Sequence, residues 1–175
     1  MPDDEKKLYP PPNYCQCSES VYRSSFPSAQ YNYPHLRGVG LDKVIALTYW
    51  AADKFAEADT SFGYAITTLE ELPKHLEANA GSLSDFTLNN TMHMERQQAN
   101  AQVMEEILGH VKECEDKGEK VLIVCATGKY LTSMTIGCWR KTHQQWAMSS
   151  IFEEMRRFEG VGSAQLPLEQ FVEMY

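Results

Sequence analysis

The segment Val121-Leu-Ile-Val-Cys-Ala-Thr-Gly-Lys-Tyr-Leu-Thr132 decides the fold. Its first four residues are apolar, as in a strand at the middle of a sheet that is covered on both faces. Cys125 ends this strand, and the apolar stretch from Ser133 to His143 predicts a helix after the loop. A buried strand, a tight loop and a helix N-terminus form a common phosphate-binding arrangement, because backbone N–H groups and the helix dipole face the anion.

The loop contains Gly128 and Lys129, which first suggests a nucleotide-binding P-loop. That pattern requires glycine five positions before Gly128, where Ile123 stands, and Ser or Thr after the lysine, where Tyr130 stands. The sequence therefore excludes a nucleotide P-loop. A cysteine phosphatase uses the same geometry with different chemistry: a thiolate at the strand end attacks phosphorus, and an arginine six positions later grips the phosphoryl oxygens.

Outward from this loop, strands and helices alternate, which predicts the α/β class. Strands are expected at residues 20–25, 43–48, 85–88 and 121–124, and helices at 31–38, from Thr68 onward, 94–113, 133–143 and 150–158, with a loop at 51–65. The best-defined helix is 94–113, where apolar residues recur at helical spacing. We expect a mainly parallel central sheet of four or five strands, with Val121–Val124 in the middle and helices on both faces.

The chain has 175 residues and a mass of 19.9 kDa, which suits one domain of ordinary size. The run Pro10-Pro11-Pro12 predicts an extended arm over residues 1–14, followed by a single domain over 15–175. A formal charge of −8 argues against nucleic acid or an anionic membrane as partner. With no long apolar run, and with cysteines and histidines lacking metal-ligand spacing, we expect a cytoplasmic protein with no metal and no cofactor.

The loop Cys125–Thr132 resembles the Cys-x5-Arg-Ser/Thr loop of the tyrosine-phosphatase superfamily. The likeness is to its plant and fungal atypical dual-specificity branch, which includes the fungal group named for oxidant-induced cell-cycle arrest. It extends to Ser20–Pro27, Gly137–Lys141, Trp146–Glu154, Arg157-Phe158 and Gln170–Tyr175. The resemblance implies that Cys125 occupies the nucleophile position. It also implies a phosphate-binding loop made of Ala126, Thr127, Gly128, Lys129, Tyr130, Leu131 and Thr132.

Three positions depart from the pattern of active relatives. Val124 precedes the cysteine where they have His, and Leu131 stands at the arginine position. An Asp general acid is also expected from a loop after a preceding strand. Between residues 86 and 98 the only carboxylate is Glu95, within the predicted helix, and Asp85 stands at the start of the predicted strand and not after it. An arginine on a transferring phosphoryl group is worth about 10³ to 10⁵ in rate, and a general acid about 10² to 10⁴.

These departures predict a pseudophosphatase with the phosphatase fold and little turnover. It would act by binding a phosphorylated small molecule, a phosphoprotein or a partner such as a family paralogue. One alternative is an active cysteine-dependent phosphatase on phosphoproteins or inositol polyphosphates, in which Lys129 or another cation replaces the arginine. A second alternative is a redox-responsive thiol protein, because a thiolate at a helix N-terminus is easily oxidised. In that case Cys138, in the following helix, is a potential partner of Cys125.

Overall fold

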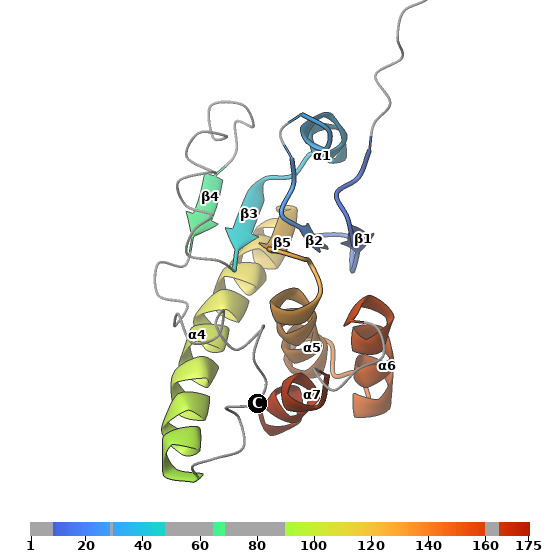
Figure 1. Ribbon diagram of the computed structural model, residues 1–175. Helices are drawn as coiled ribbons and strands as arrows, with labels where there is room; N and C mark the ends of the chain where they lie inside the picture. Colours follow the sequence, from blue (N-terminus) through green and yellow to red (C-terminus); the bar gives the residue numbers. More distant parts are fainter. Residues whose placement is uncertain (1–8, 29, 48–64, 69–89, 160–164) are drawn as a thin grey trace, which may run out of the picture.

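The computed structural model describes residues 9–28, 30–47, 65–68, 90–159 and 165–175. Its centre is a five-stranded sheet in the spatial order β1-β2-β5-β3-β4 (Figure 1). The strands are β1 (Cys15–Gln16), β2 (Val21–Ser25), β3 (Lys43–Ala46), β4 (Ala65–Thr68) and β5 (Val121–Cys125). β1 runs antiparallel to β2, and the other three strand pairs are parallel. This arrangement confirms the predicted mainly parallel sheet.

β5 lies at the middle of the sheet, between β2 and β3, and all five of its residues are buried. Its parallel register pairs Cys125 with Ser25 of β2 and Val124 with Ala46 of β3. The three central strands therefore end at the same edge. Ligands of parallel sheets bind outside the carboxyl ends of the strands, so Cys125 stands at the edge where a ligand is expected.

Helices cover both faces of the sheet, as the apolar sequence of β5 predicts (Figure 1). Val121, Ile123 and Cys125 join the larger core cluster, which includes residues of α4 (Asn90–Lys117), α5 (Tyr130–Thr142), α6 (Met148–Glu159) and α7 (Gln165–Met174). Leu122 and Val124 point to the other face and pack with residues of α1 (Tyr33–Val39). This alternation is the two-residue period of a strand buried on both sides.

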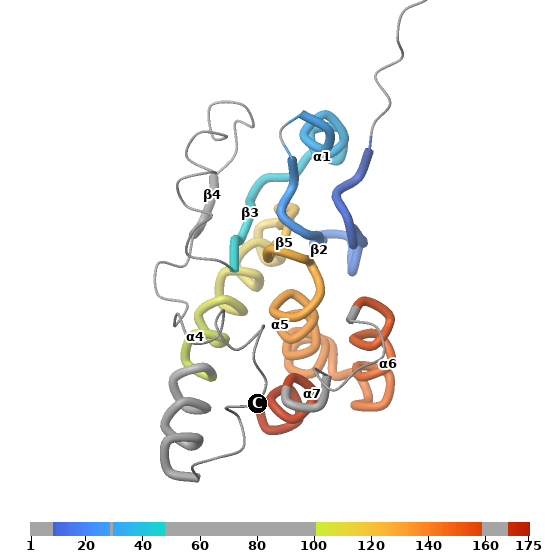
Figure 2. The backbone as a smooth tube through the Cα atoms, in the orientation of Figure 1, coloured from blue at the N-terminus to red at the C-terminus, as the bar shows by residue number. Residues whose placement is uncertain are grey.

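The chain passes from β5 through a short loop into α5, and α6 and α7 pack beside α5 (Figure 2). α5 is buried from Leu131 to Arg140. Charged side chains of α5 form hydrogen bonds with the two neighbouring helices, α6 and α7. Arg140 donates two hydrogen bonds to the Glu154 carboxylate on α6, at 3.0 and 2.7 Å, and the Lys141 Nζ donates to the Val172 carbonyl on α7 at 3.0 Å. These contacts make Arg140 and Lys141 structural residues.

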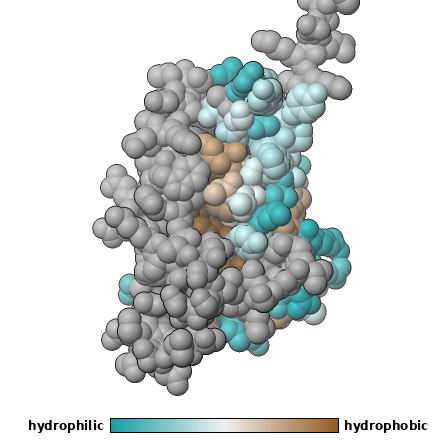
Figure 3. Space-filling view, viewed as in Figure 1, coloured by the Kyte–Doolittle hydropathy of each residue, from teal (hydrophilic) through white to brown (hydrophobic). Residues whose placement is uncertain are grey.

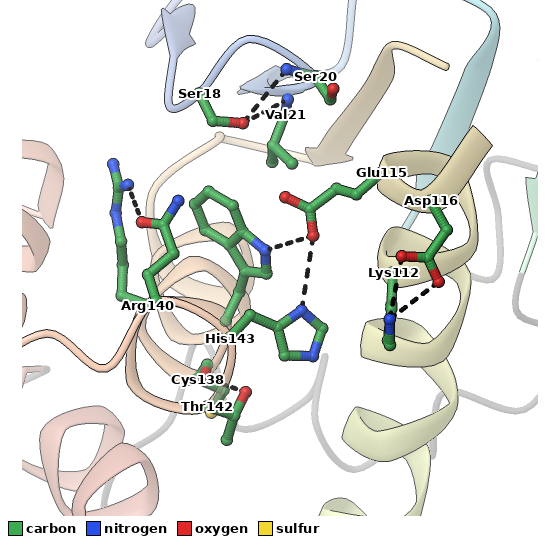
Figure 4. Close-up of polar contacts among 12 residues, drawn as sticks. Ser18, Ser20, Val21, Lys112, Glu115, Asp116, Cys138, Arg140, Thr142 and His143 are labelled. Carbon is green, nitrogen blue, oxygen red and sulfur yellow. Dashed lines mark hydrogen bonds and ion pairs between the residues drawn. The ribbon is translucent and has the colours of Figure 1, made fainter. Parts of the chain in front are cut away.

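α4 and α5 are joined by a polar contact at their facing sides (Figure 4). The Glu115 carboxylate accepts a hydrogen bond from the Trp139 indole Nε1 at 3.1 Å. The same Glu115 oxygen lies 3.6 Å from Nδ1 of His143, toward which Figure 4 shows it pointing. The Trp139 ring is fully buried, so its N–H needs an acceptor inside the protein, and Glu115 supplies one.

Several boundaries differ from the sequence predictions. The helix predicted at 94–113 spans 90–117, and the helix predicted from Ser133 begins at Tyr130. Thr68, predicted to cap a helix, is instead the last residue of β4, because β-branched residues pair with the open edge of β3. α7 was not predicted at all. The loop expected at 51–65 lies outside the described residues except for Ala65, which begins β4 instead. The helix after Thr68 and the strand at 85–88 also lie outside the described residues.

The described part of the predicted arm, residues 9–14, lies against the sheet. The Pro12 carbonyl accepts a hydrogen bond from the Ser25 N–H at 2.8 Å, and Tyr14 stacks on Tyr22. The division into an arm over 1–14 and a single domain over 15–175 stays a prediction. On the face drawn in Figure 3, hydrophobic described residues gather near the centre and hydrophilic ones along the right margin. Within the described helices, none combines the length and hydrophobicity that crossing a membrane requires.

Candidate active site

Cys125 ends β5 and is buried, and its sulfur has one direct polar partner among the residues that the structure describes. The Thr132 hydroxyl, in the first turn of α5, donates a hydrogen bond to Cys125 Sγ at 2.8 Å. This hydrogen bond ties the first turn of α5 to the sulfur at the end of β5. Thr132 was predicted as part of the phosphate-binding loop, and its fully buried side chain lies against Cys125, the predicted nucleophile.

The loop between β5 and α5 consists of residues 126–129. Ala126 and Thr127 are exposed, whereas Lys129 is half-buried. Lys129 precedes the helix without a side-chain capping hydrogen bond. The first N–H groups of a helix have no partner within the helix, so those that begin at Tyr130 are free to meet an anion. Together with the dipole of the 13-residue helix, they make this end of α5 attractive to phosphate.

Gly128 gives the loop its shape. Its φ of +67° is in the left-handed region, which favours glycine, and a Cβ at this position would collide with the backbone of Ser24 and Ser25. The loop therefore lies directly on β2. This close approach turns the Gly128 carbonyl toward Arg23, whose Nη2 donates to it at 2.7 Å. A glycine at this position is thus required by both its backbone conformation and its packing.

Arg23 is the residue that sequence reasoning missed. It comes from β2, is fully buried, and its Nη2 also donates to the Ser133 hydroxyl at 2.8 Å. Its guanidinium lies 3.6 Å above the Phe158 ring centroid. Burial lowers the pKa of Arg23, while Cys17, Glu154 and Cys125 act in the opposite direction. The signal in the sequence was a charged residue within a strand that is otherwise uncharged, Val21-Tyr-Arg-Ser-Ser25.

The part of the arm nearest the loop also touches it. The Asn13 side-chain amide donates to the Thr127 carbonyl at 2.7 Å. On the other side of the same turn, the Thr127 hydroxyl accepts from the Lys129 N–H at 3.3 Å. Asn13 and Arg23 therefore hold two carbonyls of the loop, those of Thr127 and Gly128. These contacts hold the loop in one conformation from outside it, and among the N–H groups of the loop that of Lys129 is already engaged by Thr127.

The three departures from the active pattern occupy definite places. Leu131 is 5% exposed and belongs to the larger core cluster, so it packs as an apolar residue at the arginine position. Val124 is fully buried on the α1 face of the sheet. Glu95 lies in α4, as predicted, whereas Asp85 is outside the described residues. The structure thus places no cation at residue 131, and it leaves the general-acid position undescribed.

Cys138, the potential redox partner of Cys125, lies in the middle of α5. It has no exposed surface and belongs to the same core cluster as Cys125. Burial raises its pKa, so Cys138 is held as a thiol. A buried neutral thiol reacts slowly with oxidants and disulfides. The placement of Cys138 therefore favours a packing role over the exchange that the sequence suggested.

Comparison with known proteins agrees with this geometry. The model of the tyrosine phosphatase family matches residues 8–175. The chain belongs to this family. A putative tyrosine-protein phosphatase OCA1 of Mycosarcoma maydis is 32% identical over 174 residues, which cover 96% of this chain and 93% of that protein. The inositol diphosphatase DSP2 of Oryza sativa subsp. japonica is 26% identical and is matched over 96% of this chain and 72% of its own length.

Solved structures give the same result for the fold. The catalytic core of Siw14 superposes with a TM-score of 0.66 at 25% identity, over 97% of this chain and 88% of that one. A related crystal structure is the core catalytic domain of the PP-IP phosphatase SIW14 from S. cerevisiae in complex with citrate, with 27% identity and a TM-score of 0.60 over 96% of this chain and 88% of that one. The resemblance and the fold predicted from the sequence are therefore both confirmed.

Proposed function

We propose that this chain is a cysteine-dependent phosphatase for a phosphorylated small molecule of the inositol diphosphate class, with Cys125 as nucleophile. The observation that carries the proposal is the hydrogen bond from the Thr132 hydroxyl to the Cys125 sulfur, at the head of a loop shaped for an anion. The names of the relatives, which include several inositol diphosphatases, support an active enzyme better than an impaired one.

The chemistry follows from the placement of these groups. The Cys125 thiolate attacks the terminal phosphorus, the bond from phosphorus to the leaving oxygen breaks, and a thiophosphate ester forms on the cysteine. Water then attacks that ester, releasing inorganic phosphate and restoring the thiolate. Backbone N–H groups of the loop hold the phosphoryl oxygens. Lys129 is the cation within the loop itself, and among the described residues no hydrogen bond or ion pair engages its ammonium.

A second function is favoured by one observation, the buried Leu131. A leucine neither forms the bidentate pair that an arginine makes with phosphate nor stabilises the charge of the transition state. Without an arginine at this position, the loop would still present N–H donors to a phosphate. On this alternative the protein binds a phosphorylated ligand, or uses the loop to contact a phosphoprotein or a paralogue, with turnover too slow to matter. This is the pseudophosphatase that the sequence predicted.

One experiment separates the two functions. Wild-type protein and a Cys125→Ser variant are incubated with an inositol pyrophosphate, and released phosphate is measured alongside the thermal shift caused by the ligand. An active phosphatase releases phosphate with the wild type only, and both proteins show the thermal shift. A thermal shift with equal phosphate release from the two proteins establishes the binding function. Absence of both phosphate release and thermal shift contradicts both functions.

A further inference from the structure

A second pair of cysteines lies at the edge strand β1, which Cys15 begins and Cys17 directly follows. Cys15 and Cys17 are two residues apart in extended chain, so their side chains point to the same face. Cys15 pairs directly with Arg23 of β2, and the Cys17 N–H bonds to the Val21 carbonyl at 2.8 Å. Both cysteines are reduced and half-buried, which leaves them open to a small reagent.

Arg23 lies beside this pair and has N–H groups that no hydrogen bond within the described part of the chain engages. Only its Nη2 is engaged, by the Gly128 carbonyl and the Ser133 hydroxyl. Its Nε and Nη1 are buried and have no hydrogen-bond partner among the described residues. Directly paired residues of an antiparallel ladder have Cβ atoms about 4.5 to 5.5 Å apart. A buried positive charge with two unpaired N–H groups therefore lies beside the side chain of Cys15.

We propose that Cys15 and Cys17 form a second thiol site, distinct from Cys125, which a hydroperoxide oxidises to an intramolecular disulfide. The guanidinium of Arg23 favours the thiolate of Cys15 over the thiol, because a nearby cation stabilises the charged form. Cys17, on the same face of the strand, is the resolving thiol. Two cysteines on one face of an extended chain are spaced near the upper end of the range that a disulfide spans.

The reaction balances as follows. The Cys15 thiolate attacks the outer oxygen of the hydroperoxide, the O–O bond breaks, and the departing oxygen takes a proton to give an alcohol or water. Cys15 is then a sulfenic acid. The Cys17 sulfur attacks that sulfur and the S–O bond breaks. The leaving hydroxyl takes the Cys17 proton and departs as water. Two thiols are oxidised by two electrons and the hydroperoxide is reduced by two electrons.

The charges around the pair fit these roles. The pKa of Cys15 is lowered to about 6, first by its hydrogen bond with Cys17 and then by Arg23 and Arg140, against the effects of burial and of Glu154. The pKa of Cys17 is raised by the same hydrogen bond and by burial. The more accessible Cys15 is thus the cysteine that loses its proton more readily, and the more buried Cys17 is the one that keeps it. The reaction requires this difference, because Cys15 attacks the hydroperoxide and Cys17 then attacks the sulfenic acid.

The test uses the full chain with Cys125→Ser, so that the nucleophile at the end of β5 does not react. The protein is treated with equimolar hydrogen peroxide, alkylated under denaturing conditions and analysed by peptide mass spectrometry. We expect the peptide with Cys15 and Cys17 to lose two hydrogen atoms and to resist alkylation, while Cys114 and Cys138 are alkylated in full. Full alkylation of Cys15 and Cys17 would overturn the proposal, as would a sulfinic acid on Cys15 without a bond to Cys17.

Two further variants assign the roles. With Cys17→Ser added, oxidation should stop at a sulfenic acid on Cys15 that dimedone traps, and no intramolecular disulfide should form. With Cys17→Ala added, the midpoint of Cys15 alkylation against pH should rise from about 6, because the hydrogen bond that lowers its pKa most is gone. The matched control Cys114→Ser should leave that midpoint in place. An unchanged midpoint with Cys17→Ala contradicts the assigned pairing.

Discussion

Two buried arginines lie in neighbouring regions of this protein, and their hydrogen-bond partners differ in charge. Arg140, between α5 and α6, is 5% exposed, and its guanidinium binds the Glu154 carboxylate at 2.7 Å. Arg23, beneath the loop that follows β5, is 0% exposed and donates only to the neutral oxygens of Gly128 and Ser133. One charge is neutralised by a carboxylate. The other has no carboxylate as a hydrogen-bond partner among the described residues, and it lies under the predicted phosphate-binding loop.

The difference separates a structural region from the one proposed to be functional. An ion pair inside a helix layer is held by mutual neutralisation, and removing one partner leaves the other charge buried and uncompensated. A lone buried guanidinium is costly to desolvate, and such costs concentrate at functional sites. The chain has a formal charge of −8, so a positive charge beneath the loop makes the electrostatic potential there locally favourable for an anion.

The largest expected effect comes from giving the loop the guanidinium it lacks. Leu131→Arg should raise turnover of an inositol pyrophosphate by about 10³, because an arginine that clamps a transferring phosphoryl group has that order of effect. Initial rates of phosphate release measure it, and Leu131→Met is the matched control with an apolar side chain of similar size. If Leu131→Arg stays folded by circular dichroism but is no faster than Leu131→Met, the position does not face the phosphate.

The next effect lies in the helix layer. Glu154→Ala leaves the Arg140 guanidinium buried without its carboxylate, and unfolding in urea should show a loss of about 3 kcal/mol. The double variant Arg140→Met with Glu154→Leu should recover most of that loss, because no charge is left buried. The thermal shift caused by phosphate should persist in both. A Glu154→Ala protein as stable as wild type would mean that this pair contributes nothing net.

The sequence predicted the centre of the sheet better than its edges. The central position of β5, the mainly parallel sheet and the position of Cys125 followed from one apolar run and the loop after it, because a strand buried on both faces has few alternatives. The short edge strands did not follow. β1 has two residues and β4 has four. Such short segments are too brief to show the two-residue hydrophobic period of a strand. Such strands are defined by the neighbour with which they pair.

The roles of Arg23 and Asn13 could not be read from the sequence for a related reason. Asn13 is 114 residues from Thr127, whose carbonyl it binds, and Arg23 is 105 residues from Gly128. No local pattern links residues so far apart. Leu131 was different, because its position in the loop alone identified the missing guanidinium. Local spacing was enough to single out a candidate such as Leu131, whereas contacts across the sheet required the structure.

A third prediction compares the two arginines directly. Arg23→Met strands no carboxylate: it removes the donor to the neutral oxygens of Gly128 and Ser133 and the cation beside Cys15. Its cost in unfolding free energy should be about 1 to 2 kcal/mol, below that of Arg140→Met, which strands a carboxylate. The order should reverse for ligand binding. Arg23→Met should abolish the thermal shift caused by phosphate, and Arg140→Met should keep it. Equal shifts in the two variants would show that Arg23 does not support the loop.

The smallest expected effect is at the contact between α4 and α5, in the structural region. Glu115→Ala leaves the buried Trp139 N–H without its acceptor, which should cost about 1 to 2 kcal/mol in urea unfolding. Glu115→Gln keeps an oxygen that can accept this hydrogen bond and removes only the charge near His143, 3.6 Å away and partly exposed to solvent. Its cost should therefore be below about 0.5 kcal/mol, as for most exposed ion pairs. If Gln is as harmful as Ala, the charge on Glu115 matters more than the hydrogen bond. The helix layer would then depend on electrostatics near its surface as well as on the buried Arg140 pair.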